Sequence, residues 1–286
     1  LDIDGNRCGY LQVTDDMDTL EYLKKFEHRD LPFQVLDAQE ASTQLGAPLT
    51  QNALFFSGAS WLHPAAVCQE RLSHAQIQLR EFCGDCDFLA GPTGWKTHDS
   101  QGNCYESDIL ILATANRLTT SLETAWLPLQ TIRGQTTHMA ATELSGNLRT
   151  AFCHEGYLPP PRLGIHCLGA TYGPQDTNLD ERSTDHVTNL TKLATALPSV
   201  KFPTATADLS GHVALRCTTT DYLPVVGAVP NKAAFNACYA GLQARKTRFI
   251  DQECPVFPGL FVLAGLGSRG LTAGPLAAEI LASEIM

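Results

Sequence analysis

The stretch LAGLGSRGLTAGPLAAEILASEIM, from Leu263 to Met286, decides how the C-terminal end of this chain folds. It begins inside GLFVLAG, residues 259–265, a short apolar run between glycines that predicts a buried strand. GLGSRG then predicts a turn, and TAGPLAAEILASEI, residues 272–285, predicts a helix. We expect one apolar face on this helix. Its members would be Leu276, Ile280 and Leu281.

The turn of this unit carries an arginine, Arg269, between two segments that are built to be buried. Glycines let a ligand approach the backbone closely, and the start of a helix offers N–H groups and the positive end of the helix dipole. A positive side chain at this place therefore suits an anionic or electron-rich ligand. A tight connection that binds nothing would show the same pattern, so the turn needs support from the rest of the sequence.

Length and composition describe an ordinary globular chain. It has 286 residues, of which 44% are hydrophobic and 17% are charged, enough for one large or two small domains. The formal net charge is -10, which is the wrong sign for binding nucleic acid through phosphate neutralisation alone. We interpret the densest basic cluster, Arg245, Lys246 and Arg248, as a solvated helix face.

The sequence shows neither a membrane span nor a secretion signal. No apolar run approaches the roughly 20 residues that a bilayer-spanning helix needs. The start, LDIDGNRCGY, has no basic segment followed by an apolar one, and it lacks an initiator methionine, so we expect a piece of a longer protein. The 10 cysteines are scattered, several of them inside apolar runs. We therefore expect a reducing compartment, the cytoplasm, and no membrane partner.

Cys83 and Cys86, in EFCGDCDF, form the one C-x-x-C pair of the sequence. Neither a second pair nor two histidines at zinc spacing accompany it. Two thiolates supply only half of a tetrahedral zinc site. We expect a loop with two free thiols and no bound metal, with a zinc site or a redox pair as the less favoured alternatives.

Strand and helix patterns alternate through the middle of the chain. Residues 94–98 alternate in polarity, residues 99–103 resemble a turn, and DILILAT, residues 108–114, is a continuous apolar run that predicts a strand buried on both faces. Residues 183–197 predict an amphipathic helix. Its expected apolar face consists of Val187, Leu190, Ala194 and Leu197. Together these elements predict a mixed α/β (α+β) fold.

Five segments occur in an order that resembles one enzyme group. They are DILILATANRL, LPLQTIRGQTTHM, EGYLPPPRLGIHCLGATY, ALRCTTTDYLPVVGAVP and LAGLGSRGLTAGPLAAEIL. This order is similar to that of the FAD-dependent amine oxidases of the glycine oxidase, sarcosine oxidase and D-amino acid oxidase group. WLHPAAV and GLGSRGLTAGPLAAEIL narrow the resemblance to the C-terminal oxidase module of bifunctional enzymes that make 5-methylaminomethyl-2-thiouridine in tRNA. The resemblance runs from about Cys8 to the C-terminus.

The resemblance implies a reaction and its partners. In that family, FAD accepts a hydride from the carboxymethylaminomethyl group of the tRNA wobble uridine, and hydrolysis of the imine leaves the aminomethyl uridine. A methyltransferase domain fused in cis then methylates the amine with S-adenosylmethionine. The resemblance also implies a glycine oxidase-like fold, with a partial FAD-binding domain and an antiparallel-sheet substrate domain. We expect the substrate subdomain at residues 1–60 and 118–212, and the FAD-binding part at residues 61–117 and 213–286.

The chain departs from the family pattern in two places. The family's oxidase module opens with a strand–helix–strand unit that carries G-x-G-x-x-G and holds the ADP half of FAD. No such unit opens this sequence, and Gly265, Gly267 and Gly270 follow a strand at the opposite end. We therefore expect a C-terminal fragment that binds FAD weakly or not at all by itself. The second departure is Ala113 to Asn116, ATAN, where the group usually has a glycine.

The resemblance assigns roles to individual residues. Arg216 would anchor the glycine-like carboxylate of the substrate through its two-pronged guanidinium, and Tyr157 would place a phenol near the same carboxylate. The residues expected along the flavin are Gly265, Gly267, Ser268, Arg269, Gly270, Leu271 and Thr272. Two other functions stay open: a small amine or amino-acid oxidase of the same fold, and a non-catalytic module that docks tRNA.

Overall fold

The computed structural model describes residues 4–14, 16–25, 33–202, 209–242 and 252–286. The basic cluster of Arg245, Lys246 and Arg248 lies outside these residues. Contacts divide the chain into two compact units. Unit 1 comprises residues 1–77, 133–173 and 177–214, and unit 2 comprises residues 78–132, 174–176 and 215–286. The roles of substrate binding and cofactor binding remain predictions for these units.

Unit 1 is built on strands that are mainly antiparallel. Its five-stranded sheet has the order β12 (Tyr157–Leu158), β11 (Ala151–Cys153), β2 (Tyr10–Thr14), β4 (Asn52–Phe56) and β3 (Gln34–Leu36). A second sheet centres on β10 (Leu129–Ala140), which pairs with β13 (Ile165–Leu168), β14 (Gly173–Pro174) and β15 (Ser210–Thr219). Two long strands, β10 and β15, each run from one unit into the other.

Helices α2 (Ala38–Leu45) and α4 (Ser183–Ala196) contribute to the apolar core of unit 1. Asp37 begins α2 with a capping box, and Gly46 ends it in the left-handed conformation with a φ of 85°. Fully buried Leu45, Phe152 and Leu193 bring α2, β11 and α4 into one cluster. The remaining elements of unit 1 are α1 (Met17–Lys24), α3 (Pro64–Leu72), β1 (Gly5–Asn6), β5 (Trp61–Leu62) and the short helix η2 (Ser145–Asn147).

A buried polar layer joins β10 to α4 in unit 1. Arg133 is only 2% exposed. It donates to the carbonyls of Asn178 at 2.6 Å and Asp180 at 2.7 Å, and to the Asp185 carboxylate at 2.5 Å. Gln135 is fully buried and accepts a hydrogen bond from the Arg133 guanidinium at 3.1 Å. Arg133 and Gln135 of the R-G-Q segment therefore link the start of α4 to β10 through hydrogen bonds.

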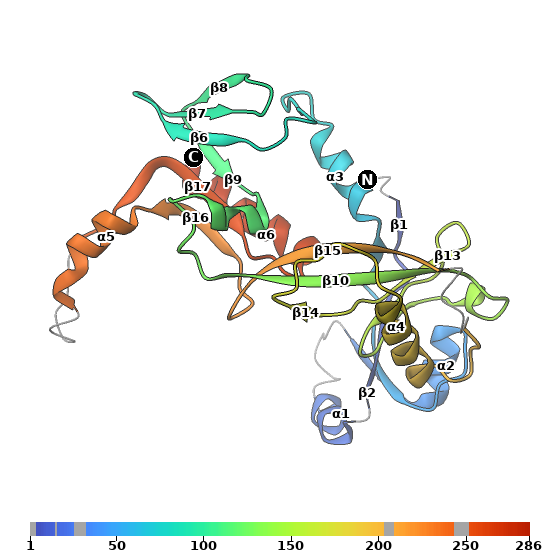
Figure 1. The fold of residues 1–286 in the computed structure, drawn as a ribbon. Coiled ribbons are helices and arrows are strands. Elements are labelled where there is room, and N and C mark those ends of the chain that lie inside the picture. The colour runs from blue at the N-terminus through green and yellow to red at the C-terminus, as the bar shows by residue number, and fades with distance from the viewer. Residues whose placement is uncertain (1–3, 15, 26–32, 203–208, 243–251) are drawn as a thin grey trace. The chain divides into compact units, whose positions relative to one another are not determined.

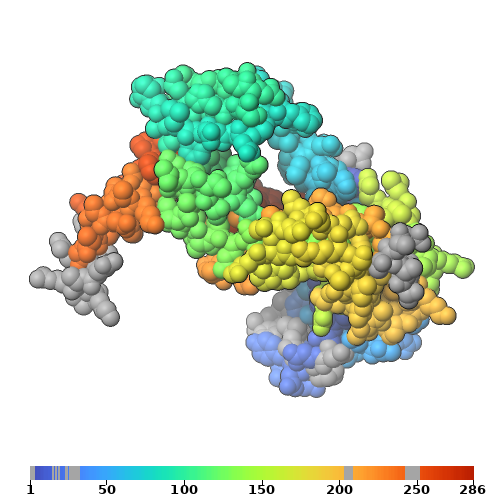
Figure 2. Space-filling model, in the orientation of Figure 1, coloured from blue at the N-terminus to red at the C-terminus, as the bar shows by residue number. Residues whose placement is uncertain are grey.

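Unit 2 holds a three-stranded sheet in the order β16 (Val225–Pro230), β17 (Val256–Ala264) and β9 (Leu110–Leu112), with β17 and β9 parallel. Helix α6 (Gly270–Ile285) packs against β16 and β17 (Figure 1). The antiparallel strands β6 (Asp87–Ala90), β7 (Trp95–His98) and β8 (Cys104–Ser107) form a further sheet, shown in teal in Figure 2 against the green segment that follows it. Helices α5 (Lys232–Tyr239), η1 (Ala115–Thr120) and η3 (Ala240–Leu242) complete the unit.

The structure confirms the mixed α/β class and corrects two predicted faces. Residues 108–114 do not form a strand buried on both faces: β9 covers only Leu110–Leu112, and Ile109 and Ile111 are 42% and 46% exposed. The reason is that only one face of β9 packs, since Leu110 and Leu112 join the apolar cluster of unit 2 and the side chains that alternate with them do not. In α6, Leu281 is buried but Leu276 and Ile280 are exposed, so the three do not share one buried face.

The predicted face of α4 is also corrected. Val187 and Ala194 are exposed, whereas His186 and Asn189 are buried beside Leu190. The polar side chains can be buried because they bond to β10. His186 Nδ1 lies 2.8 Å from the Thr137 hydroxyl, and the Asn189 amide donates to the Gln135 carbonyl at 3.0 Å. Among the helices that the structure describes, none is long and apolar enough to cross a membrane.

Candidate functional site

A pocket of about 330 Å³ lies in unit 2 where the parallel strands β9 and β17 end. Its lining comes from the residues that follow β9, from β15, and from the end of β17 with its glycine turn. The lining residues are Ala113, Ala115, Leu215, Arg216, Cys217, Leu263, Ala264, Gly265, Leu266 and Gly267. Ligands of parallel α/β sheets bind beyond the carboxyl ends of the strands. This pocket is therefore the candidate functional site, and it brings Arg216 together with Gly265 and Gly267.

The backbone of the glycine turn favours glycine at two positions. Gly265 and Gly267 have φ values of 72° and 54°, in the left-handed region that side chains disfavour. A Cβ on Gly265 would lie 3.0 Å from the Thr219 methyl group, and one on Gly267 would lie 3.2 Å from the Thr218 hydroxyl. The Gly267 N–H donates to the Cys217 carbonyl at 2.8 Å. The turn is thus bonded to β15, next to Arg216.

The rest of the predicted flavin-binding segment forms the start of α6. Ser268, Arg269, Gly270, Leu271 and Thr272 are exposed and do not line the pocket. Arg269 is the residue before the helix and makes no side-chain cap, and its carbonyl accepts the N–H of Thr272 at 3.1 Å. The first N–H groups of a helix have no partner within the helix, and the positive end of its dipole lies there. These residues are accessible to an anionic or electron-rich group.

Arg216 is partly buried in β15 and lines the pocket. The preceding residue is held by Asn116, whose side-chain amide donates to the Leu215 carbonyl at 3.4 Å. The same amide group accepts the Thr131 hydroxyl at 3.1 Å, so Asn116 connects β15 to β10. This role of Asn116 was not predicted from the sequence. The one signal was the departure at ATAN, where an amide side chain follows the turn.

Two further pocket residues limit the chemistry of the site. Ala115 has a φ of 52°, a conformation that costs a residue with a Cβ about 1–2 kcal/mol.

Cys217 is buried, and burial raises the pKa of its thiol, while a hydrogen bond from the Gly265 backbone opposes that rise. The thiol is therefore protonated at neutral pH, and a protonated thiol is a poor nucleophile. The pocket can bind and orient a ligand, and it does not present a thiolate.

Tyr157 belongs to unit 1, whereas Arg216 belongs to unit 2. Tyr157 lies in β12, where its backbone N–H donates to the Gly169 carbonyl at 2.7 Å. The residue is 37% exposed. The structure thus holds the backbone of Tyr157 firmly and leaves part of the side chain accessible. Its role beside Arg216 remains a prediction.

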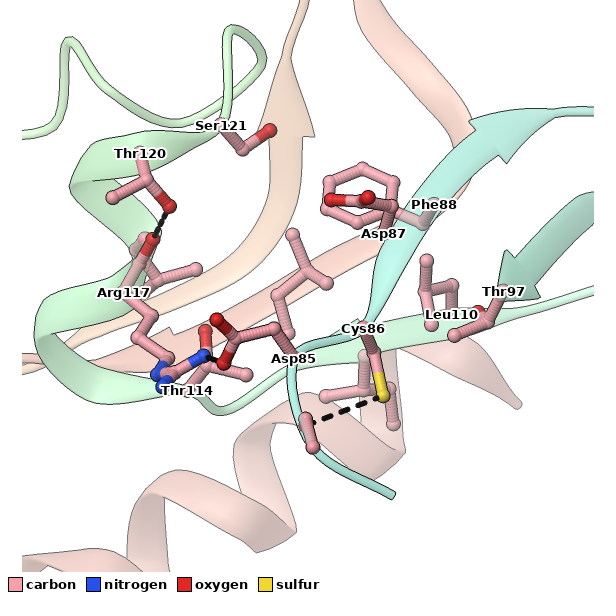
Figure 3. Close-up of a pocket in the computed structure, with 14 residues that line it drawn as sticks. Asp85, Cys86, Asp87, Phe88, Thr97, Leu110, Thr114, Arg117, Thr120 and Ser121 are labelled. Carbon is pink, nitrogen blue, oxygen red and sulfur yellow. Dashed lines mark hydrogen bonds and ion pairs between the residues drawn. The ribbon is translucent and has the colours of Figure 1, made fainter. Parts of the chain in front are cut away.

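A second pocket, of about 460 Å³, lies beside β9 and includes part of the C-x-x-C loop. Asp85 and Arg117 point toward each other and form an ion pair at this pocket, and the Cys86 sulfur contacts the Gly84 carbonyl (Figure 3). Burial raises the pKa of Cys86, and nearby Cys83 adds to the rise. Both thiols are free. Within the described part of the chain, no three or more histidine, cysteine, aspartate or glutamate residues gather into a group that could hold a metal ion.

Comparison with known proteins shows to which family the chain belongs. Residues 1–284 match the family model of FAD dependent oxidoreductases. The tRNA 5-methylaminomethyl-2-thiouridine biosynthesis bifunctional protein of Pseudomonas syringae is 35% identical over 98% of this chain and 43% of its own length. Its counterpart from Chromobacterium violaceum is 36% identical over 99% of this chain and 44% of its length. The chain thus spans less than half of the curated relatives that it matches.

Solved structures support the same fold. The glycine oxidase of Geobacillus kaustophilus superposes with a TM-score of 0.75 at 18% identity. The match covers 100% of this chain and 72% of the oxidase. The iminodiacetate oxidase of Chelativorans superposes with a TM-score of 0.73 at 19% identity, over 99% of this chain and 73% of the oxidase. At this level of identity the likeness establishes the fold alone. The resemblance that the motifs indicated is confirmed at the level of the family.

Proposed function

Since this chain belongs to the FAD dependent oxidoreductase family, we propose that its pocket at the ends of β9 and β17 is the amine-oxidising site. The proposed substrate is the 5-carboxymethylaminomethyl group of a wobble uridine in tRNA, because relatives 35–36% identical are named for the biosynthesis of 5-methylaminomethyl-2-thiouridine. The observation that carries the proposal is the joint placement of Arg216 and the glycine turn in one pocket.

The residues at the pocket fit the ring end of a flavin. Gly265 and Gly267 keep side chains away from the turn, and a Cβ at either place would crowd Thr219 or Thr218. A flat ring can approach such a backbone closely, and the start of α6 favours negative charge on it. The residues that would hold it are Gly265, Gly267, Ser268, Arg269, Gly270, Leu271 and Thr272. FAD, when bound, takes up the two electrons of the oxidation.

The chain's own residues orient the substrate. We infer that the Arg216 guanidinium pairs with the carboxylate of the carboxymethyl group through two parallel hydrogen bonds, which fixes the carbon that is oxidised. Tyr157, in unit 1, is proposed as a second substrate-binding residue. Loss of two electrons and two protons from the C–N bond leaves an imine on the substrate. Water then converts this imine into glyoxylate and the 5-aminomethyl uridine, so that the atoms balance.

The bifunctional relatives suggest the next step. We propose that a methyltransferase domain in the same longer polypeptide uses S-adenosylmethionine to methylate the new amine, as the word bifunctional in their names suggests. A tRNA substrate would place both steps in the cytoplasm. All ten cysteines are free, which is typical of proteins in a reducing compartment and supports this proposal.

One experiment separates this function from its alternatives. The chain, supplied with excess FAD, is incubated in separate reactions with tRNA that carries 5-carboxymethylaminomethyluridine, with glycine and with sarcosine. Glyoxylate is measured, and the modified nucleoside is identified by mass spectrometry. Glyoxylate from the tRNA alone supports the proposal. Oxidation of free glycine or sarcosine alone would replace it by a small-amine oxidase, and tRNA binding without any oxidation would replace it by a docking module.

A further inference from the structure

A third pocket, of about 670 Å³, lies entirely within unit 1. It shares no residue with the pocket of Arg216 in unit 2. Strand β2 contributes Gln12 and Thr14, the end of β11 contributes His154, and α4 contributes Lys192 and Thr195. Pockets that bind small molecules measure roughly 300–1,000 Å³. This pocket is therefore large enough for a molecule of several groups, and larger than a single ion needs.

The imidazole of His154 is the unusual group in this pocket. Its ring stacks on fully buried Phe152, with 5.4 Å between the ring centroids and 30° between the planes. Both ring nitrogens are buried, and neither has a hydrogen-bond partner in the described part of the chain. A buried polar atom without a partner costs stability, and native proteins satisfy most such atoms. An apolar ring would fill the same space without this cost, so the two nitrogens indicate a ligand.

His154 meets a ligand as a neutral group. Burial lowers its pKa to about 4, and the charge of nearby Lys192 adds to the shift. At neutral pH the imidazole therefore has one N–H donor and one nitrogen acceptor. The edges of nucleobases also carry donors and acceptors side by side, and proteins recognise unpaired bases through hydrogen bonds to these edges.

The charged and polar side chains of the pocket suit the rest of a nucleotide. Among the described lining residues, Lys192 is the only cation with a permanent charge, and a lysine ammonium binds phosphate as a point charge. The Thr195 hydroxyl and the Gln51 amide can bond to a ribose. Glu155 is the only carboxylate of the lining, and it can accept from hydroxyls but repels further negative charge. One cation and one anion favour a ligand with a single phosphate.

We propose that this pocket of unit 1 binds a nucleotide with one phosphate, either free or as an unpaired residue of an RNA chain. Lys192 would pair with the phosphate, and His154 with the edge of the base. Both nitrogens of His154 are closed off from solvent in this conformation, so the flexible Lys192 side chain would turn toward the phosphate and uncover them. One contact of this kind is compatible with the net charge of -10, which disfavours binding along many phosphates.

Calorimetric titration of the 286-residue chain with AMP, UMP and their two nucleosides tests the site. At least one monophosphate should bind about ten- to a hundredfold more tightly than its nucleoside, because the phosphate adds a charge-assisted pair with Lys192. Lys192→Ala should remove this advantage. Lys201→Ala, at an exposed lysine of unit 1 outside the pocket, is the control and should preserve it.

A short single-stranded RNA separates the two sources of the nucleotide. Tighter binding of the RNA than of either monophosphate would identify a residue of an RNA chain, and the reverse order would identify a free nucleotide. In both cases Lys192→Ala should weaken the tighter ligand by at least about tenfold. If neither the monophosphates nor the RNA lose more affinity in Lys192→Ala than in Lys201→Ala, the proposal is wrong.

His154→Phe distinguishes a ligand-binding histidine from a structural one. Phenylalanine keeps the stacked ring and removes the two nitrogens that lack partners. The melting temperature at neutral pH should therefore stay the same or rise, whereas the affinity for the tighter ligand should fall by at least about tenfold. A lower melting temperature with an unchanged affinity would show that His154 serves the fold and would remove it from the site.

Discussion

Arg133 in unit 1 and Arg216 in unit 2 both lie in segments that resemble family motifs, and the structure gives them different surroundings. Arg133 is 2% exposed and bonds to two carbonyls, a side-chain amide and a carboxylate. Arg216 is partly buried and lines a pocket at the ends of two parallel strands. An arginine in a motif can thus maintain the fold or face a ligand, and only its surroundings distinguish the two roles.

The largest expected effect is on stability, at Arg133. Arg133→Met should lower the free energy of unfolding by about 3–5 kcal/mol, because it leaves the partly buried Asp185 carboxylate and the carbonyls of Asn178 and Asp180 without their donor. Chemical denaturation measures this. Arg162→Met is the control, because Arg162 pairs with Asp4 on the surface, at 44% and 35% exposure, and its loss should be hardly measurable. Equal losses would erase the distinction between buried and exposed arginines.

The second prediction concerns activity, at Arg216. Arg216→Lys keeps the charge and loses the paired geometry, and charge-assisted hydrogen bonds are worth about 1.5–3 kcal/mol. Oxidation of the carboxymethylaminomethyl group should fall roughly ten- to a hundredfold at about 1.4 kcal/mol per decade. The melting temperature should not change. Unchanged oxidase kinetics would remove Arg216 from the site, and methylation by a fused domain should be unaffected.

A third prediction tests the backbone of the pocket. Ala115 has a φ of 52°, so Ala115→Gly should stabilise unit 2 by about 0.5–1 kcal/mol, because glycine relieves the strain. Ala113, in the same pocket, lies outside the left-handed region, and Ala113→Gly should destabilise the unit by about 0.5–1 kcal/mol. Thermal unfolding of both variants provides the measurement. Shifts of the same sign would show that the conformation of Ala115 is not strained.

A fourth prediction is a pH dependence in unit 1. Burial lowers the pKa of His154 to about 4, and nearby Lys192 adds to the shift. The folded state therefore keeps His154 neutral where the unfolded state takes up a proton, so stability is full above about pH 6.5 and falls as the pH drops toward 4. His154→Phe should remove part of this fall, worth a few degrees in melting temperature between pH 7 and 5. The same change at exposed His74 controls for the loss of a histidine.

The strand, turn and helix at the C-terminal end could be predicted from the sequence, because their signals are local, although the predicted apolar face of α6 was wrong. The apolar run, the left-handed glycines and the helix pattern of β17 and α6 all act within about thirty neighbouring residues. The order of the motifs predicted that Arg216 binds substrate. In the structure Arg216 lines the same pocket as Gly265 and Gly267. These features depend on backbone conformation and on short-range periodicity.

The features that the sequence did not predict depend on distant partners. His186 and Asn189 read as polar positions of α4, yet they are buried because β10, some fifty residues earlier, offers Gln135 and Thr137. Asn116 reaches Leu215 across 99 positions. The exposure of Ile111 depends on which face of β9 the rest of the unit packs against, and no local pattern records that choice. Such pairings follow from the topology.

The most direct test of the account is a titration of the 286-residue chain with FAD and with riboflavin, followed by flavin fluorescence. The proposed ring site lies at the glycine turn, and no G-x-G-x-x-G motif for the ADP half was recognised in the first part of the given sequence. We therefore predict weak binding by the 286 residues, with the two affinities within about tenfold of each other, and further weakening of both by Gly267→Val. FAD binding more than about a hundredfold tighter than riboflavin binding, or an unchanged affinity in Gly267→Val, would contradict it.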